Sequence, residues 1–302
     1  MLTAPTSAKP ADAKPADAKP ADARPADAKP ADARPAEARP ADARPADARP
    51  ADARPADAKP AVEDVADLPP RVRMLRAMRA LAKIVADPEQ TELVLEFSNL
   101  INAGRRDDRL GFFFDDPAGA KLYAEGRALD SKTIDLDRLA ALPEGTLGHA
   151  YAHFMKAHGL TPDVFDGPPP EVRDPHAAYV IQRIRQTHDL WHVVTNAETD
   201  PAGEVALQAF TFAQLHAPSS GILALVGTLR GLRQTRQIVR DAVELYRTGA
   251  RARKLAVFAW EDHWETPITE VRRLLGLPER PRKFGGYSAG LHSPAKTTKM
   301  AA

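Results

Sequence analysis

A proline-rich pentapeptide repeat occupies most of the first sixty residues. Between Lys9 and Ala58 the unit Lys-Pro-Ala-Asp-Ala recurs, with Arg replacing Lys in many copies and Glu37 replacing one Asp. Proline at every fifth position interrupts any helix, and alanine is the only other apolar residue, so the repeat has no side chains from which to build a core. We therefore expect residues 1–61 to be a disordered spacer that precedes the folded part of the 302-residue chain.

Charge and hydropathy exclude several partners and locations. Each repeat unit pairs one cation with one anion, which makes the repeat neutral and unsuited to binding nucleic acid. No run of apolar residues is long enough to span a membrane, and the N-terminal residues lack the apolar segment of a secretory signal. The chain has no cysteine, which agrees with a reducing compartment. We expect a bacterial cytoplasmic protein that does not bind nucleic acid.

The rest of the chain has the periodicity of helices. Apolar residues recur at three- and four-residue spacing after Pro70, and again along the segment that follows Asp174-Pro175. Residues 110–142 can be assigned only as helix and loop, and no part of the chain requires a sheet. We predict an all-α fold, with a single multi-helix domain over residues 62–280 and a flexible basic tail over residues 281–302.

The strongest candidate site is a cluster of histidines and carboxylates. His188 and His192 are one helical turn apart, so their imidazoles project from one face of a helix and can bind a single divalent cation. Asp189 lies about 100° around the same helical turn. It can serve either as a third metal ligand or as an acceptor that orients an imidazole. Nitrogen and oxygen ligands without a thiolate favour zinc, and less strongly cobalt, manganese or iron.

Glu204 extends this cluster. Asp200-Pro201 is typical of a helix start with Asp200 as the N-cap, and the capping-box position then falls on Gly203 rather than on Glu204. Capping therefore does not account for the glutamate, which is left as a further candidate ligand. An apolar run with several small residues follows at positions 222–229, and we expect it to line a cavity for an apolar ligand.

Two other groups of residues are weaker candidates. His149 and His153 are also one turn apart, but no carboxylate accompanies them, so two ordinary histidines on a helix are the simpler interpretation. Arginines then recur every three or four residues in a segment with few acids. They form either a solvated helix face or a contact for anionic lipid headgroups or an acidic partner, and we call them the basic surface: Arg230, Arg233, Arg236 and Arg240.

Several further segments accompany the cluster. They are Pro143-Glu-Gly-Thr-Leu-Gly148 with Tyr151 and Phe154, Asp174-Pro175 with Ala178-Tyr-Val180, Gln182-Arg-Ile-Arg-Gln186, and Trp264-Glu-Thr-Pro267. The cluster itself reads His-Asp, two residues, His, eleven residues, Glu, at His188, Asp189, His192 and Glu204. Over residues 70–278 the chain thereby resembles the coenzyme Q biosynthesis protein 4 family, whose signature has these residues at this spacing.

The resemblance implies a fold, a cofactor and a location. It implies an all-α domain, a divalent metal, preferably zinc, held by those four side chains, and an isoprenoid tail lodged in an apolar cavity. It also implies a peripheral protein on the inner face of a bacterial membrane that works in ubiquinone biosynthesis. Other quinone-biosynthesis enzymes would be its partners, and a homodimer is left open.

The activity that the resemblance implies is metal-dependent oxidative decarboxylation. The substrate would be a polyprenylated hydroxybenzoate whose ring carboxyl is replaced by a hydroxyl, with the metal as Lewis acid. The alternative is a non-catalytic lipid-binding scaffold that organises the other enzymes. A metal-dependent phosphohydrolase also uses a His-Asp pair, but it would need an upstream His and a distant Asp that the sequence does not identify.

Overall fold

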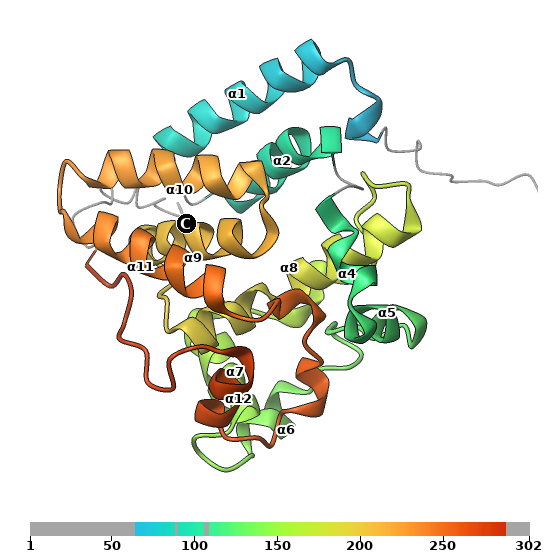
Figure 1. The fold of residues 1–302 in the computed structure, drawn as a ribbon, viewed down its shortest axis with the longest axis vertical. Coiled ribbons are helices and arrows are strands. Elements are labelled where there is room, and N and C mark those ends of the chain that lie inside the picture. Colours follow the sequence, from blue (N-terminus) through green and yellow to red (C-terminus); the bar gives the residue numbers. More distant parts are fainter. Residues whose placement is uncertain (1–63, 88–89, 106–108, 288–302) are drawn as a thin grey trace, which may run out of the picture. The chain divides into compact units, whose positions relative to one another are not determined.

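The computed structural model describes residues 64–87, 90–105 and 109–287. Within these residues every regular element is a helix, apart from two isolated bridges that pair Thr146 with Pro267 and Ala197 with Phe284. The predicted all-α fold is therefore confirmed (Figure 1). The pentapeptide repeat and residues 288–302 lie outside the described residues, so the disordered spacer stays a prediction.

Short helices and single 3-10 turns connect the longer helices. In chain order the α-helices are α1 Pro70–Ala86, α2 Thr91–Asn102, α4 Phe112–Asp115, α5 Pro117–Ala124, α6 Leu136–Ala140, α7 Leu147–His158, α8 Pro175–Thr195, α9 Pro201–Leu215, α10 Pro218–Gly231, α11 Gln237–Arg251 and α12 Ile268–Leu275. Among the described helices, none combines the length and the apolar character needed to cross a membrane.

Aspartate and proline set the starts of α8 and α9. Asp174 caps α8 and Asp200 caps α9, each by accepting a hydrogen bond from a backbone N–H of the first turn, and proline follows both. At the other end of α8, Asn196 has a left-handed φ of 60°, which turns the chain toward α9. The expected helix start at Asp200 is thus present, and Glu204 lies in the first turn of α9.

The main core joins α7, α8 and α9 to the segment around α12. Large aromatic side chains are fully buried at its centre, among them Trp191, Phe210 and Trp260. The rings of Trp191 in α8 and Phe210 in α9 meet edge to face, with centroids 6.1 Å apart. This contact helps to fix the two helices that carry the candidate ligands.

A second apolar cluster joins α1, α2 and α10. Its buried members are Leu68, Ala77, Ala80, Ile84, Phe97 and Leu100, with Ile222 and Leu223 of α10 packed against them. In Figure 1, α1, α2 and α10 lie together at the end of the domain opposite α6 and α12. This packing buries one side of α1 and leaves Met74, Leu75 and Met78 exposed.

The chain after α12 packs against the domain. Phe284 is only 2% exposed, and the buried carboxylate of Asp241 accepts hydrogen bonds from Arg282 and from the hydroxyl of Tyr287. Residues 281–287 therefore belong to the packed domain rather than to a flexible tail, because an apolar side chain and a buried partner charge hold them in place. The remainder of the predicted tail lies outside the described residues.

Candidate metal centre

Two histidines of α8 face the same side of the helix. The ring centroids of His188 and His192 are 4.9 Å apart, and the ring planes are inclined at 68°. The side chain of His192 is 1% exposed, whereas that of His188 is 33% exposed. His192 lies within residues 190–195 of α8, every one of which is buried, whereas His188 lies outside this stretch.

Glu204 approaches the histidines from the first turn of α9. Its Oε1 lies 3.2 Å from Nε2 of His192. One ligand atom each from His188, His192 and Glu204 lie within 4.8 Å of one another. Two ligands of a tetrahedral zinc ion, each bonded at about 2.0–2.1 Å, are roughly 3.3 Å apart, so the separation of His192 and Glu204 suits a shared cation.

The loop between α8 and α9 orients His192. Its Nδ1 lies 3.0 Å from the carbonyl oxygen of Ala197, so we assign the ring proton to Nδ1. The lone pair of Nε2 then faces the Glu204 carboxylate, and Nε2 is buried without a hydrogen bond to a described residue. A lone pair and a carboxylate that face each other are stabilised by a cation between them, so these residues fit a divalent metal. The ring of Phe154 stacks on the imidazole at 5.6 Å.

Asp189 lies beside this group and not in it. Its Oδ1 is 3.7 Å from Nδ1 of His188, whereas the three side chains whose ligand atoms converge are His188, His192 and Glu204. Of the two roles that the sequence allows for Asp189, the geometry favours the acceptor that orients an imidazole. Its role as a metal ligand stays a prediction.

The carboxylates and the histidines shift each other's pKa values. Burial alone would lower the pKa of His188, but Asp189 and Glu204 outweigh it and raise that pKa above its ordinary value. Burial alone would raise the pKa of Glu204, but His192 and His188 bring it below its ordinary value. Glu204 is therefore ionised at neutral pH, and the positive N-terminal end of α9 favours that charge.

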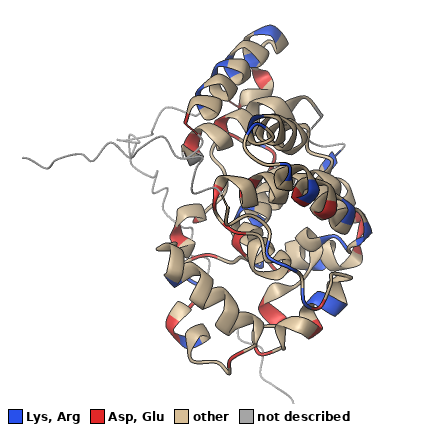
Figure 2. Cartoon of the chain, turned by 90° about the vertical axis from the view of Figure 1, so that its left-hand side faces the viewer, with Lys and Arg blue, Asp and Glu red and all other residues tan. Residues whose placement is uncertain are grey.

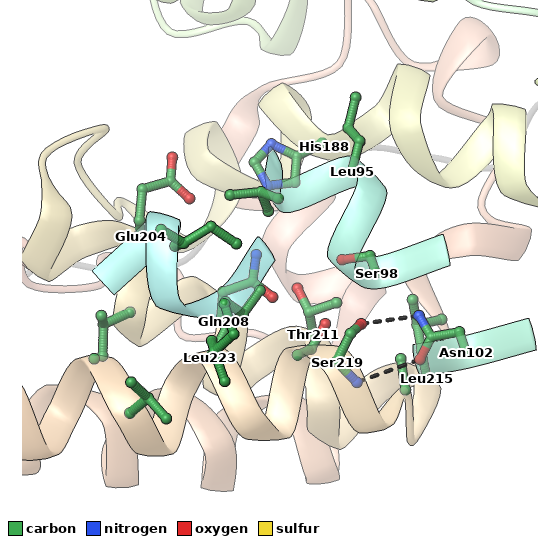
Figure 3. Close-up of a pocket in the computed structure, with 18 of the residues that line it drawn as sticks. Leu95, Ser98, Asn102, His188, Glu204, Gln208, Thr211, Leu215, Ser219 and Leu223 are labelled. Carbon is green, nitrogen blue, oxygen red and sulfur yellow. Dashed lines mark hydrogen bonds between the residues drawn. The ribbon is translucent and has the colours of Figure 1, made fainter. Parts of the chain in front are cut away.

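The group borders a cavity of about 750 Å³. Helices α1, α2, α8, α9 and α10 all contribute to its wall, which includes His188 and Glu204 (Figure 3). Much of the remaining wall is apolar, with side chains such as Leu95, Ile184, Leu215, Leu223 and Val226. The apolar run of residues 222–229 thus contributes to a cavity wall, while the occupant of the cavity stays a prediction.

Sequence patterns did not identify several residues of this cavity wall. Helix α9 presents Glu204, Gln208, Thr211 and Leu215 to the cavity, and their spacing of four, three and four residues is a helical signal that could have identified them. Ser98 of α2 carries no comparable signal, because it is far from the histidines in the chain. The carbonyl of Ala197 carries none either, since every residue has one.

The second histidine pair lacks a third ligand. The rings of His149 and His153 are 4.2 Å apart, and His153 is exposed on α7. Among the described residues, the one group of three or more converging ligand residues is that of His188, His192 and Glu204. The geometry agrees with ordinary histidines on a helix. A phosphohydrolase would require an additional His and an additional Asp at the centre. Among the described residues, neither joins the converging group.

The basic surface is exposed to solvent. Arg230 lies in α10 and Arg240 in α11, and Arg233 and Arg236 lie between these helices. None of the four forms an ion pair with another described residue, so their charges are available to a partner. Arg230 also belongs to the cavity wall, which links the basic surface to the cavity.

Relatives of this chain are named ubiquinone biosynthesis proteins. The mitochondrial ubiquinone biosynthesis protein COQ4 of Coprinopsis cinerea is 35% identical over 167 residues, which are 55% of this chain and 57% of that protein. The corresponding COQ4 homolog of Rattus norvegicus is 34% identical over 175 residues, which are 57% of this chain and 66% of that protein. The match thus spans less than two thirds of the length of either relative.

A solved structure and a family pattern extend these matches. A crystal structure from Nostoc punctiforme PCC 73102, described as that of a candidate ubiquinone biosynthesis protein, is 30% identical with a TM-score of 0.56. The superposition covers 67% of this chain and 97% of the Nostoc chain. The sequence pattern of the coenzyme Q (ubiquinone) biosynthesis protein Coq4 matches residues 67–281. As the resemblance predicted, the chain belongs to the coenzyme Q (ubiquinone) biosynthesis protein Coq4 family.

Proposed function

We propose that this protein catalyses the metal-dependent oxidative decarboxylation of a polyprenylated hydroxybenzoate in ubiquinone biosynthesis. The observation that carries the proposal is the position of His188 and Glu204, which belong both to the converging ligand group and to the wall of a largely apolar cavity. Such a site can hold a substrate carboxylate against a cation, preferably zinc, while the cavity takes up the apolar tail.

The exchange of a ring carboxyl for a hydroxyl is a two-electron oxidation. Written with water as the oxygen source, the carboxyl leaves as carbon dioxide, and two protons and two electrons pass to an external acceptor. A divalent cation supplies Lewis acidity when it is bound. The residues of the chain bind and orient: the Ala197 carbonyl keeps the lone pair of His192 turned toward Glu204, and the apolar wall takes up the prenyl tail.

Removal of one ligand tests the proposal. We expect His188→Ala to lose most of its bound zinc and its conversion of a prenylated hydroxybenzoate, because fewer ligands hold the ion more weakly. The matched control is His153→Ala, which removes an exposed histidine of α7 and should retain both properties. Metal analysis and mass spectrometry of the products are the measurements. Unchanged metal content and conversion in His188→Ala would show that the site and the activity are both wrong.

A non-catalytic scaffold would use the same cavity without chemistry. The apolar wall supports this alternative, because it can bind a lipid whether or not a reaction follows. If the metal-loaded protein binds the prenylated hydroxybenzoate and never converts it, even with an electron acceptor present, the scaffold replaces the enzyme. Contacts with other quinone-biosynthesis enzymes, and a homodimer, are compatible with either function and stay predictions.

We also propose that α1, α10 and the basic surface contact the inner face of a bacterial membrane. The sequence of α1 contains five cations and no acid, and Figure 2 shows Lys and Arg recurring along this helix at the top of the view. Large apolar side chains are exposed nearby, at Met74, Leu75 and Met78 on α1 and at Leu225 and Leu229 on α10. Exposed apolar side chains beside cations are typical of helices that lie on anionic lipid.

A further inference from the structure

Three polar side chains of the cavity wall have no hydrogen-bond partner among the described residues. They are Ser98 of α2 and Gln208 and Thr211 of α9. Thr211 is 9% exposed, and its hydroxyl oxygen is buried and unpaired. Figure 3 shows Ser98, Gln208 and Thr211 around the cavity, between Glu204 and His188 at one side and Asn102 and Ser219 at the other.

Another pair of polar residues in the same wall is fully engaged. The side-chain amide of Asn102 donates to the hydroxyl of Ser219 at 2.8 Å, and the backbone N–H of Ser219 donates to the Asn102 carbonyl oxygen at 3.3 Å. These two residues connect α2 to the start of α10. Buried polar groups in proteins are nearly always hydrogen-bonded, so the buried and unpaired hydroxyl of Thr211 requires a partner. Ser98 and Gln208 are partly buried and line the same cavity. Their position indicates a partner that enters the cavity.

The spacing of Glu204 and Gln208 along α9 suits an aromatic ring. Gln208 follows Glu204 by four residues on α9, and a helix rises about 6 Å over four residues. This rise is close to the length of a benzene ring with substituents at its two opposite ends. A ring whose carboxylate lies at the centre can therefore place the opposite substituent beside the amide of Gln208.

We propose that Gln208, with Ser98 and Thr211, recognises the ring hydroxyl of the substrate. The inference rests on the proposed function, since it assumes that the carboxylate lies at the metal centre. The Gln208 carbonyl can accept the phenolic proton, while the hydroxyls of Ser98 and Thr211 can donate to the two lone pairs of the phenolic oxygen. None of the three side chains is charged, so the subsite suits a neutral hydroxyl better than a phosphate or a second carboxylate. Gln208 thereby determines the orientation of the ring and selects hydroxylated substrates.

A pair of ligands that differ by one hydroxyl tests the subsite. The probes are 3-geranyl-4-hydroxybenzoate and 3-geranylbenzoate, and their affinities are measured by calorimetry with the full-length, zinc-loaded protein. In Gln208→Leu, we expect the hydroxylated ligand to lose about five- to tenfold in affinity, as for one neutral hydrogen bond, and the ligand without the hydroxyl to change by less than about twofold. The matched control is Gln234→Leu, the same change at an exposed residue outside the cavity wall, which should alter neither affinity.

Two outcomes would overturn the subsite. Equal losses for both ligands in Gln208→Leu would indicate a packing effect, and unchanged affinities would indicate that Gln208 meets only solvent. If Gln208→Leu does not fold, Ser98→Ala takes its place and should weaken the binding of the hydroxylated ligand selectively. The proposed function fails separately, because a wild-type protein that binds neither probe excludes this class of substrate altogether.

Discussion

Glu171 connects two helices through a single carboxylate. It accepts hydrogen bonds from Asn99 of α2 at 2.6 Å and from Arg185 of α8 at 2.7 Å, and Arg185 also donates to Asn99 at 3.0 Å. The side chains of Glu171 and Arg185 are each 16% exposed. Asn99 and Arg185 lie in the cavity wall, so this contact holds α2 in position along the cavity.

Acid should weaken this contact. Burial alone would raise the pKa of Glu171, but Arg185 and Asn99 outweigh it and lower that pKa below its ordinary value. A carboxyl group with a lowered folded-state pKa adds stability above its unfolded-state pKa, and this stability disappears as the pH falls through the folded-state pKa. We expect Glu171→Gln to be less stable than the wild type at about pH 7 and the difference to shrink below about pH 4. Urea unfolding at a series of pH values measures it.

The control for this prediction is an exposed carboxylate on α2, the helix whose Asn99 contacts Glu171. Glu96 of α2 is exposed, and Glu96→Gln makes the same chemical change. Its free energy of unfolding should stay within about 0.5 kcal/mol of the wild-type value at each pH. The prediction is wrong if the two variants follow the same pH dependence, because the contact with Arg185 would then contribute nothing of its own.

Among single residues, the candidate ligands were easier to predict than the groups that position them. The spacing of His188 and His192 places them on one helical face, and the capping pattern leaves Glu204 unexplained, so local rules were enough. The distance of Asp189 from Glu204 depends on how α8 and α9 meet, which is a property of the tertiary structure. For the same reason, no pattern in the sequence indicates that the Ala197 carbonyl orients His192.

Helix α1 has three different sides. One packs against the domain, one is apolar and exposed, and one is basic. The buried side carries Ala77, Ala80 and Ile84. With 3.6 residues per turn, Met74, Leu75 and Met78 share the second side, and Arg76, Arg79 and Lys83 share the third. A second copy of α1 packed on this face would bring cations together, whereas anionic lipid would neutralise them.

Two acidic substitutions on the exposed apolar side test the membrane contact. We expect Leu75→Glu with Met78→Glu to weaken binding to phosphatidylglycerol vesicles about tenfold or more, because apolar contacts are lost and negative charge is added. Co-sedimentation at low and high salt measures this. The control is Val164→Glu, at a valine that is 66% exposed in the 3-10 turn Pro162–Phe165, which is not part of α1, α10 or the basic surface.

Two results of the vesicle experiment would contradict the proposed contact with anionic lipid. Binding of the wild type that is indifferent to lipid charge and to salt would exclude a role for α1 and for the basic surface. If the wild type is a dimer and the double variant is a monomer with unchanged vesicle binding, the exposed side of α1 meets a second copy instead.

At the scale of elements, prediction succeeded where the signals are local. Proline marks the starts of α1, α8 and α9, and a capping aspartate precedes it in α8 and α9. The apolar periodicity of these helices is also long enough to be recognised. Residues 110–142 could be assigned only as helix and loop. The structure divides them into α4, α5 and α6, and helices of that length depend on tertiary contacts rather than on their own sequence.

Across the whole molecule, residues 281–287 hold the loop between α8 and α9. The backbone N–H of Phe284 donates to the carbonyl of Asn196 at 3.0 Å, and that of Glu198 donates to the carbonyl of Phe284 at 2.9 Å. Gly285 has a φ of +81°, and a Cβ there would lie 2.3 Å from the Oδ1 of Asp200, the cap of α9. Most of this segment lies beyond residue 281, where the family pattern ends. Such a long-range contact could not be predicted from the basic composition of the segment.

Substitution of Phe284 tests whether this segment positions the metal centre. The loop that it holds also supplies the Ala197 carbonyl, so loosening it should release His192 as well as expose apolar surface. We expect Phe284→Ala to lower the free energy of unfolding by about 3–5 kcal/mol and to weaken zinc binding, with Phe284→Leu intermediate in both. Urea unfolding of the metal-free protein and competition with a zinc chelator measure the two effects.

Two further variants make the test of Phe284 specific. Lys283→Ala removes an exposed partner of Glu198, and deletion of residues 1–61 removes no described residue, so both should leave zinc affinity unchanged. Zinc affinity is compared at a temperature at which every variant is folded. If folded Phe284→Ala binds zinc as tightly as the wild type, the C-terminal segment stabilises the domain without positioning His192. If it binds more weakly while Lys283→Ala does not, a segment almost entirely outside the family pattern orients the candidate ligand His192.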